Sequence, residues 1–271
     1  MLRWITGLVL AATTAVVGSA QTLYVPASAN AEGVNQTRWR TDLQVKAQGG
    51  EAASFTVELL ESRRNNSDPA TLDFTVAAGE SLRLGNLVET EFGFTGTAAL
   101  RITATEGQIL AASRTYNDDP SGTYGQTVPA VADVDGIRFG NDSILIQLSR
   151  SPDPSTGFRT NIGLVNLTDQ RIDTTIDLFR ADGSFIATLS YRLKPFEHRQ
   201  VNDVFGIAGA DDVDDGYAVV RTTDEGGRFI AYASVVDNGS GDAVFILGQV
   251  EAGAIPPQER LVVFESFMRP G

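Results

Sequence analysis

Residues 39–45 read Trp-Arg-Thr-Asp-Leu-Gln-Val, and residues 158–164 read Phe-Arg-Thr-Asn-Ile-Gly-Leu, which places the second stretch 119 positions after the first. Both stretches have an aromatic residue before Arg-Thr, a short Asp or Asn after it, and aliphatic residues beyond. A second run, at 96–103, returns at 216–223 with nearly the same spacing. Self-similarity at one spacing is typical of a repeated structural unit. The sequence therefore predicts a tandem duplication.

Apolar and polar residues alternate along many short segments. In one of them, Phe55, Val57 and Leu59 are separated by Thr56 and Glu58. This period of two is typical of a strand with one face on a core, and no segment shows sustained helical periodicity. The expected strands lie near residues 23–25, 38–45, 54–60, 72–76, 81–84, 98–105, 109–117 and 123–131 in the first copy, and near 144–149, 159–165, 174–179, 185–193, 199–204, 217–223, 229–236 and 243–250 in the second.

The pattern predicts an all-β fold of two tandem immunoglobulin-like β-sandwich domains after a signal peptide, at residues 21–133 and 137–250. The chain contains no cysteine, so no disulfide stabilises either unit. About 110 residues suffice to bury an adequate core without one. Trp39 and Phe158 occupy the same place in the repeat, and we expect both to fill the centre of their domain.

Residues 1–20 have the features of a signal peptide. Arg3 supplies the positive start, residues 8–17 an apolar centre, and Gly18-Ser19-Ala20 a small-residue cleavage site. A membrane anchor is the alternative, but the apolar run is shorter than the roughly 18 to 20 residues that span a bilayer. The expected location is periplasmic, cell-surface or extracellular, with no transmembrane segment after processing.

The C-terminal tail, residues 251–271, has no counterpart in the first copy. A breaker segment, Glu251–Pro257, precedes the largely apolar run from Arg260 to Met268. This run is predicted to be an extra strand that covers an edge of its own domain. The alternative is a strand shared with a partner chain through residues 260–268.

Several motifs carry a resemblance to a known group of proteins. They are Ser-Arg-Thr-Tyr-Asn at 113–117, Gly-Thr-Tyr-Gly-Gln at 122–126, Val-Pro-Ala at 128–130, Phe-Arg-Thr-Asn at 158–161 and Ala-Ser-Val-Val-Asp-Asn at 233–238. With these motifs, residues 23–250 resemble uncharacterised exported bacterial proteins with tandem immunoglobulin-like β-sandwich repeats. The resemblance implies the fold and export, and it assigns no site residue.

Charge and composition narrow the range of functions. The chain carries 34 acidic and 21 basic residues, a net charge of −13, and this balance argues against a nucleic-acid partner. His198 is the only histidine, and no Gly-x-Ser-x-Gly motif accompanies it. A catalytic role for His198 is one interpretation, and a solvated position on a strand is the favoured one. Neither a zinc site nor a phosphate-binding loop is indicated.

The densest group of acids is Asp211, Asp212, Asp214 and Asp215. Such carboxylates repel one another unless water solvates them or a cation neutralises them, and Ca²⁺ is the hard ion that oxygen ligands favour. These residues are interpreted either as a calcium site or as solvated turns. Ca²⁺ is the one cofactor that the sequence suggests. Residues 237–242 form a second oxygen-rich segment without EF-hand spacing.

Arg40 with Asp42, and Arg159 with Asn161, stand two residues apart on one strand face. The row is interpreted either as cross-strand pairing that fixes sheet register or as a polar ligand-binding row.

These features predict an exported non-enzymatic structural or binding module with a protein or surface glycan as partner. Membership of a cell-surface or envelope assembly is one interpretation of this role. A carbohydrate-binding module is the alternative, with Trp39, Tyr116, Tyr124 or Tyr217 as stacking platforms. A hydrolase is the third hypothesis, and fold alone separates none of these.

Overall fold

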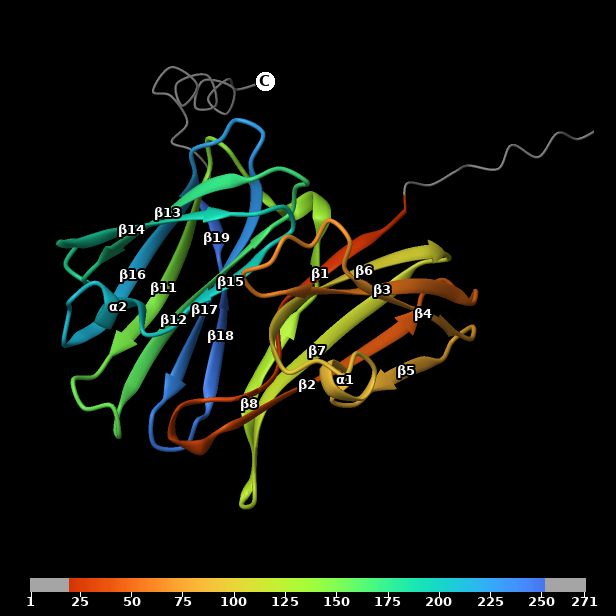
Figure 1. Ribbon diagram of the computed structural model, residues 1–271, viewed down its shortest axis with the longest axis horizontal. Helices are drawn as coiled ribbons and strands as arrows, with labels where there is room; N and C mark the ends of the chain where they lie inside the picture. Colours follow the sequence, from red (N-terminus) through yellow and green to blue (C-terminus); the bar gives the residue numbers. More distant parts are fainter. Residues whose placement is uncertain (1–19, 252–271) are drawn as a thin grey trace, which may run out of the picture.

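The computed structural model describes residues 20–251, and this part of the chain is all-β (Figure 1). The N-terminal half, residues 22–132, contains nine strands: β1 (Thr22–Glu32), β2 (Arg38–Ala47), β3 (Ala53–Glu61), β4 (Ala70–Val76), β5 (Ser81–Leu84), β6 (Gly96–Glu106), β7 (Ile109–Asp119), β8 (Gly122–Pro129) and β9 (Val131–Ala132). One turn of helix, α1 (Leu87–Thr90), follows β5, and a short 3-10 turn, Val34–Gln36, follows β1.

The C-terminal half, residues 137–251, follows a second 3-10 turn at Asp133–Asp135. Its strands are β10 (Ile137–Arg138), β11 (Asp142–Arg150), β12 (Phe158–Asn166), β13 (Ile172–Phe179), β14 (Phe185–Leu193), β15 (His198–Val201), β16 (Val213–Thr222), β17 (Arg228–Asp237), β18 (Ala243–Leu247) and β19 (Gln249–Glu251). Another single helical turn, α2 (Val204–Ile207), follows β15.

The two halves repeat the same strand pairing. In the N-terminal half, β4-β3-β6-β1 lie in order, and β2 pairs with β5 and β7, with β8 beyond β7. In the C-terminal half, β14-β13-β16-β11 lie in order, and β12 pairs with β15 and β17, with β18 beyond β17. Even the short β9 and β19 match, because each pairs with the first long strand of its half. The duplication seen in the sequence is thus a duplication of topology.

The halves also differ: β10, which pairs with β17, has no counterpart in the N-terminal half, and the link between the first two long strands is not the same. Two residue pairs, Ala31 opposite Trp39 and Glu32 opposite Arg38, join β1 to β2, so the N-terminal strands form a single nine-stranded sheet. The C-terminal strands form two separate five-stranded sheets.

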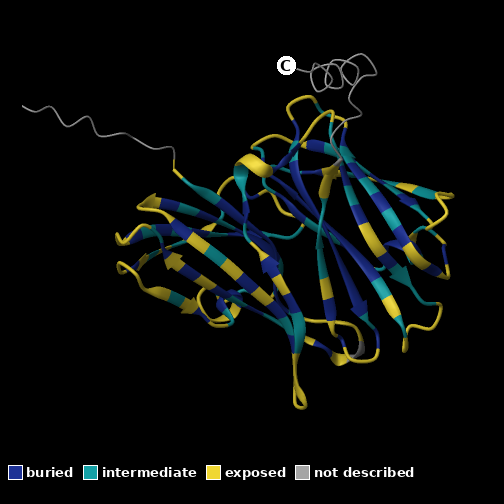
Figure 2. Ribbon diagram, turned by 180° about the vertical axis from the view of Figure 1, so that it is seen from behind, coloured by how far each residue is buried: buried dark blue, intermediate teal, exposed yellow. Residues whose placement is uncertain are grey.

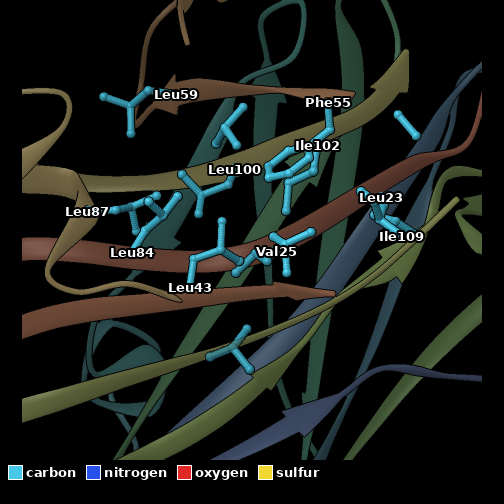
Figure 3. Close-up of a cluster of buried hydrophobic side chains, with 14 of the residues drawn as sticks. Leu23, Val25, Leu43, Phe55, Leu59, Leu84, Leu87, Leu100, Ile102 and Ile109 are labelled. Carbon is cyan, nitrogen blue, oxygen red and sulfur yellow. The ribbon is translucent and has the colours of Figure 1, made fainter. Parts of the chain in front are cut away.

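Each half has its own apolar core. In β3, Phe55, Val57 and Leu59 are buried while the residues between them are only half-buried, as the alternation predicted. Their partners in the N-terminal core include Leu43 of β2 and Leu100 of β6 (Figure 3). The same alternation of buried and exposed residues is visible along the outer strands in Figure 2. Each such side chain contributes about 1.5 to 3 kcal/mol when it is fully buried.

A third apolar cluster joins the halves. Its buried members come from both: Tyr24, Leu60, Ala99 and Val131 from the N-terminal half, and Val165, Leu167 and Ile230 from the C-terminal half. Main-chain hydrogen bonds cross at the same place, from Arg63 N to His198 O at 2.8 Å and from Asn66 N to Pro195 O at 3.0 Å. We call this set of seven residues the shared cluster. Because it is apolar and bridged by main-chain bonds, it holds the halves side by side (Figure 1).

The expectation for Trp39 and Phe158 was wrong. Phe158 is 46% exposed and Trp39 is half-buried. Both stand at the first residues of their strands, near the end of the sheet, whereas Leu43 and Ile162, farther along β2 and β12, fill the centres of the two cores. An aromatic residue at a strand end has less sheet around it to pack against.

The ends of the chain add little to this description. Residues 1–19, most of the expected signal peptide, and residues 252–271, nearly all of the expected tail strand, lie outside the described residues. Within residues 20–251, no helix is long and apolar enough to cross a membrane.

Candidate functional site

A cavity of about 180 Å³ lies where the two halves meet. Strands β1, β2 and β8 of the N-terminal half line one side, and β12, β17 and the segment after β15 line the other. Residues far apart in the sequence therefore share one space. This is the candidate site, because pockets between packed units are common places for ligands.

One wall of the cavity is apolar. It consists of small residues of β1 together with larger side chains: Ala27, Ala29, Ala31, Val34, Trp39 and Val236. Gly33 allows the indole of Trp39 to pack closely, since a Cβ on Gly33 would come within 2.6 Å of the indole Nε1. This wall suits an apolar part of a ligand.

Polar side chains from both halves also line the cavity and present hydrogen-bond donors. Gln126 and Asn161 are each 7% exposed and both line the cavity. Gln126 Oε1 accepts from Ser234 Oγ at 3.1 Å, and Asn161 Oδ1 accepts from the backbone N of Asp203 at 3.0 Å. With the oxygens engaged, the amide nitrogens of Gln126 and Asn161 remain, and no acceptor for either occurs among the described residues.

Arg159 brings a positive charge to the cavity. It is half-buried, and its Nη1 donates to Asn238 Oδ1 at 2.7 Å. No carboxylate among the described residues forms an ion pair with it. Burial lowers the pKa of Arg159, and the negative charges of Asp203 and Asp237 partly oppose that shift. The guanidinium is therefore a partly desolvated cation, and within residues 20–251 no carboxylate lies within ion-pair distance of it.

Two acids also line the cavity. Asp203 Oδ1 accepts from Arg150 Nε at 2.9 Å and from the backbone N of Gly206 at 3.2 Å, so its charge is already engaged. Glu32 is exposed at the end of β1. The cavity thus combines one unpaired cation, several free donors and one exposed carboxylate.

His198 is not the solvated strand residue that the sequence favoured. It is 1% exposed, because β15 pairs with β12 on one side and meets Ser62 of the N-terminal half in an isolated bridge. Its Nε2 lies 2.9 Å from the hydroxyl of Tyr232, which donates to Gln200 Oε1 at 3.1 Å. Since that hydroxyl proton is used, Nε2 carries the proton and donates to Tyr232. Nδ1 is then an unprotonated atom, buried without a hydrogen-bond partner.

The chemistry available to His198 is limited by this burial. Desolvation lowers its pKa from 6.5 to about 3, so the imidazole is neutral over the physiological range. Neither a serine hydroxyl nor a carboxylate of the described residues contacts the ring nitrogens, which are the contacts that nucleophilic catalysis needs.

The four aspartates predicted as calcium ligands do not point toward a common site. Asp211, Asp212, Asp214 and Asp215 are all exposed, at and just before the start of β16. The main-chain oxygens of Asp211 and Asp212 accept from two arginine side chains, Arg150 and Arg180. Within residues 20–251, no three His, Cys, Asp or Glu side chains come together as a metal site would require. Calcium binding stays a prediction.

Residues 237–242 form the turn between β17 and β18. The carboxylate of Asp237 accepts from the backbone N of Ser240 at 2.7 Å and from its hydroxyl at 2.8 Å. These bonds lower the pKa of Asp237. The oxygens of this turn close it internally, and Asn238 anchors Arg159.

The two predicted pairs, Arg40 with Asp42 and Arg159 with Asn161, have different roles in the two halves. Asp42 pairs across strands, accepting from Arg83 Nη2 of β5 at 2.6 Å, which is the register-fixing role. Arg40 bonds to Asn30 and lies 3.8 Å from Glu89. In the second copy, by contrast, Arg159 and Asn161 face the cavity. Sequence reasoning identified that pair but gave no sign of Gln126, which comes from the other half.

No protein-family model matches this chain, and none of the curated proteins matches it.

Among the aromatic residues considered as sugar platforms, Trp39 alone lines the cavity. Tyr217 is stacked on Phe179, with ring centroids 4.8 Å apart, and the Tyr116 hydroxyl donates to Asp42 at 3.3 Å. Tyr124 lies on β8 beside Ser121. These four residues form no common face.

Proposed function

We propose that the chain is an exported non-enzymatic structural or binding module, made of two immunoglobulin-like sandwich domains that act as one rigid body. The shared cluster is the observation that carries the proposal, because an apolar junction with main-chain bonds fixes the relative position of the two halves. A rigid body with extended sheet faces suits docking to a protein or a surface glycan in an envelope or cell-surface assembly. The resemblance to exported tandem-repeat proteins is consistent with this role.

The state of the titratable groups supports a non-enzymatic role. General acid–base catalysis requires a group whose pKa lies near the working pH and which reaches the substrate. His198 meets neither condition, since its pKa is about 3 and its side chain is buried.

The proposal is tested on the processed chain, residues 21–271. We expect no turnover with a panel of glycoside, ester and peptide substrates, and we expect specific crosslinks to one partner in the envelope of the producing cell. Turnover that disappears when a single acid or His198 is replaced would overturn the non-enzymatic role.

A carbohydrate-binding module is the second candidate, because Trp39 lines the cavity instead of filling a core. Stacking on an indole is a common way to bind a sugar ring. Calorimetry with oligosaccharides should then show binding that Trp39→Ala abolishes. Phe158→Ala is the matched control, since it removes the equivalent aromatic residue of the second copy, which is exposed outside the cavity.

A further inference from the structure

We propose that the cavity between the two halves binds a small organic carboxylate, whose oxygens contact Arg159 and the neighbouring amide nitrogens and whose apolar part lies against Trp39 and the β1 alanines. This inference goes beyond the proposed function, which needs only the outer surface of the molecule.

The hydrogen-bonding groups of the cavity suit a ligand that accepts hydrogen bonds. The oxygens of four amide side chains there are already engaged: those of Gln126, Asn161, Gln200 and Asn202. For Asn161 the donor is a backbone N–H, which fixes the orientation of the amide. The nitrogens of Gln126, Asn161 and Asn202 have no acceptor among the described residues. These three nitrogens are not fully buried, and Asn202 is exposed, so all three are available to donate to an acceptor that enters the cavity.

The charge in the cavity calls for an anion. Arg159 is partly desolvated and donates, among the described residues, one of the five hydrogen bonds that a guanidinium can make, to the neutral amide of Asn238. A buried charge is costly unless an opposite charge meets it. A planar guanidinium matches a planar carboxylate, because two parallel N–H donors reach its two oxygens.

The first copy provides an internal contrast. Arg40 is the counterpart of Arg159 in the duplication, and it has a counter-charge, Glu89, at 3.8 Å. It does not line the cavity. The two arginines thus share a place in the repeat. Of the two, only Arg159 has no carboxylate among the described residues within ion-pair distance, and Asp203 and Asp237 act on it from farther away.

Other ligand classes fit the cavity less well. Sugar hydroxyls donate as well as accept, and the amide oxygens of the cavity are engaged, which leaves the carboxylate of Glu32 at the rim as the main acceptor for them. A phosphate carries up to two negative charges, and one arginine beside Asp203 and Glu32 balances a single charge. The net charge of −13 does not prevent a monoanion from binding, because salt screens charges beyond roughly 8 Å at physiological ionic strength.

The volume limits the size of the ligand. An apolar cavity of about 150 Å³ can hold one benzene molecule, and this cavity measures about 180 Å³. A carboxylate of about six to ten non-hydrogen atoms is therefore expected. Two sources of this chemistry are a simple aliphatic acid and an amino acid, whose ammonium group would meet Glu32 at the rim.

The test uses calorimetry on the processed chain with hexanoate, hexanamide, leucine and sulfate as probes. Hexanoate should bind at least tenfold more tightly than hexanamide, which has the same length and no charge. Leucine binding more tightly than hexanoate would assign the site to amino acids, and the reverse order would assign it to simple acids. Equal binding of hexanoate and hexanamide would overturn the proposal. So would the absence of binding by both hexanoate and leucine at ligand concentrations up to about 10 mM.

Two variants localise the binding. Arg159→Gln should weaken hexanoate at least tenfold, whereas Arg40→Gln, the matched control at the same repeat position, should leave it unchanged. Equal losses in the two variants would contradict the proposal, as would binding of sulfate as tight as that of hexanoate. The comparison of hexanoate with hexanamide uses the unaltered chain, so it tests carboxylate binding even if Arg159→Gln does not fold. Failure of these tests would leave the surface-binding role intact, since that role is measured by partner crosslinks.

Discussion

At the scale of single residues, His198 is the group whose burial has the clearest thermodynamic consequence. Its pKa in the folded chain is about 3, below the value of 6.5 expected when it is unfolded. Between these two pH values the unfolded chain binds a proton that the folded chain does not. Stability is therefore lost as the pH falls from about 6.5 toward 3, and it is fully present above that window.

His198→Gln should remove this dependence. In the unaltered chain, the free energy of unfolding should fall by up to about 1.4 kcal/mol per pH unit more steeply than in the variant between pH 6 and 4. Urea unfolding at several pH values measures the two slopes. Glutamine keeps a polar side chain next to Tyr232. Any loss of stability from the changed packing is the same at every pH, so it does not affect the slope that reports the titration of His198. Parallel slopes in the two proteins would show that His198 does not titrate as described.

The four exposed aspartates at β16 allow a simple test of the calcium hypothesis. An ion that binds only the folded chain raises its melting temperature by mass action. If Asp211, Asp212, Asp214 and Asp215 bind Ca²⁺, melts in millimolar Ca²⁺ should lie above those in chelator. Coincident curves would mean that these aspartates are solvated turn residues.

At the scale of secondary-structure elements, the pairing of β12 with β17 shows how the second copy diverged from the first. Gly163 stands opposite Tyr232, and the corresponding pair in the first copy is Gln44 opposite Ala112. A Cβ on Gly163 would collide with the ring of Tyr232. The glycine therefore provides the space in which the large ring packs, and Tyr232 reaches the N-terminal core and His198.

Gly163→Ala should lower the free energy of unfolding by about 1 to 3 kcal/mol, because overpacking forces Tyr232 to move. The control is Gly226→Ala in the β16–β17 turn, where a Cβ meets nothing within 4 Å. Chemical denaturation of both variants gives the comparison, and we expect the control to change by no more than about 0.5 kcal/mol. A neutral Gly163→Ala would contradict the packing described for β12 and β17.

At the scale of the whole molecule, the shared cluster determines how the halves unfold. Because seven buried residues from both halves pack together, we expect a single calorimetric transition. Leu60→Ala should lower the free energy of unfolding by about 2 to 5 kcal/mol. Leu110→Ala, at an exposed position of β7, should have almost no effect. Two well-separated transitions in the unaltered chain would show that the halves are independent.

The C-terminal segment belongs to the same scale. The prediction is that deleting residues 251–271 disturbs assembly or solubility while both sandwiches still fold, because the apolar run at 260–268 suits pairing with an edge. Light scattering and circular dichroism of the shortened chain measure the two properties. A shortened chain that behaves like the full one would remove the tail from the proposed function.

Much of the fold was predictable because its determinants are local. Alternation with a period of two places strands such as β3, and the repeat spacing implies that both halves share a topology. The exception is β1, predicted at residues 23–25 and observed as Thr22–Glu32. The second part of β1 has small side chains, such as those of Ala27 and Ala29, and successive residues there are buried. A strand that is buried on both faces shows no alternation.

The sequence by itself determined the all-β class, the duplicated strand order and the acidic charge, because these depend on neighbouring residues and on composition. Only the tertiary structure decided which faces meet. It buried His198 against Tyr232, left Phe158 at the surface, and placed Gln126 of the first copy beside Arg159 of the second. Such contacts depend on how the two halves pack on each other, and packing between distant surfaces leaves no periodic signal along the chain.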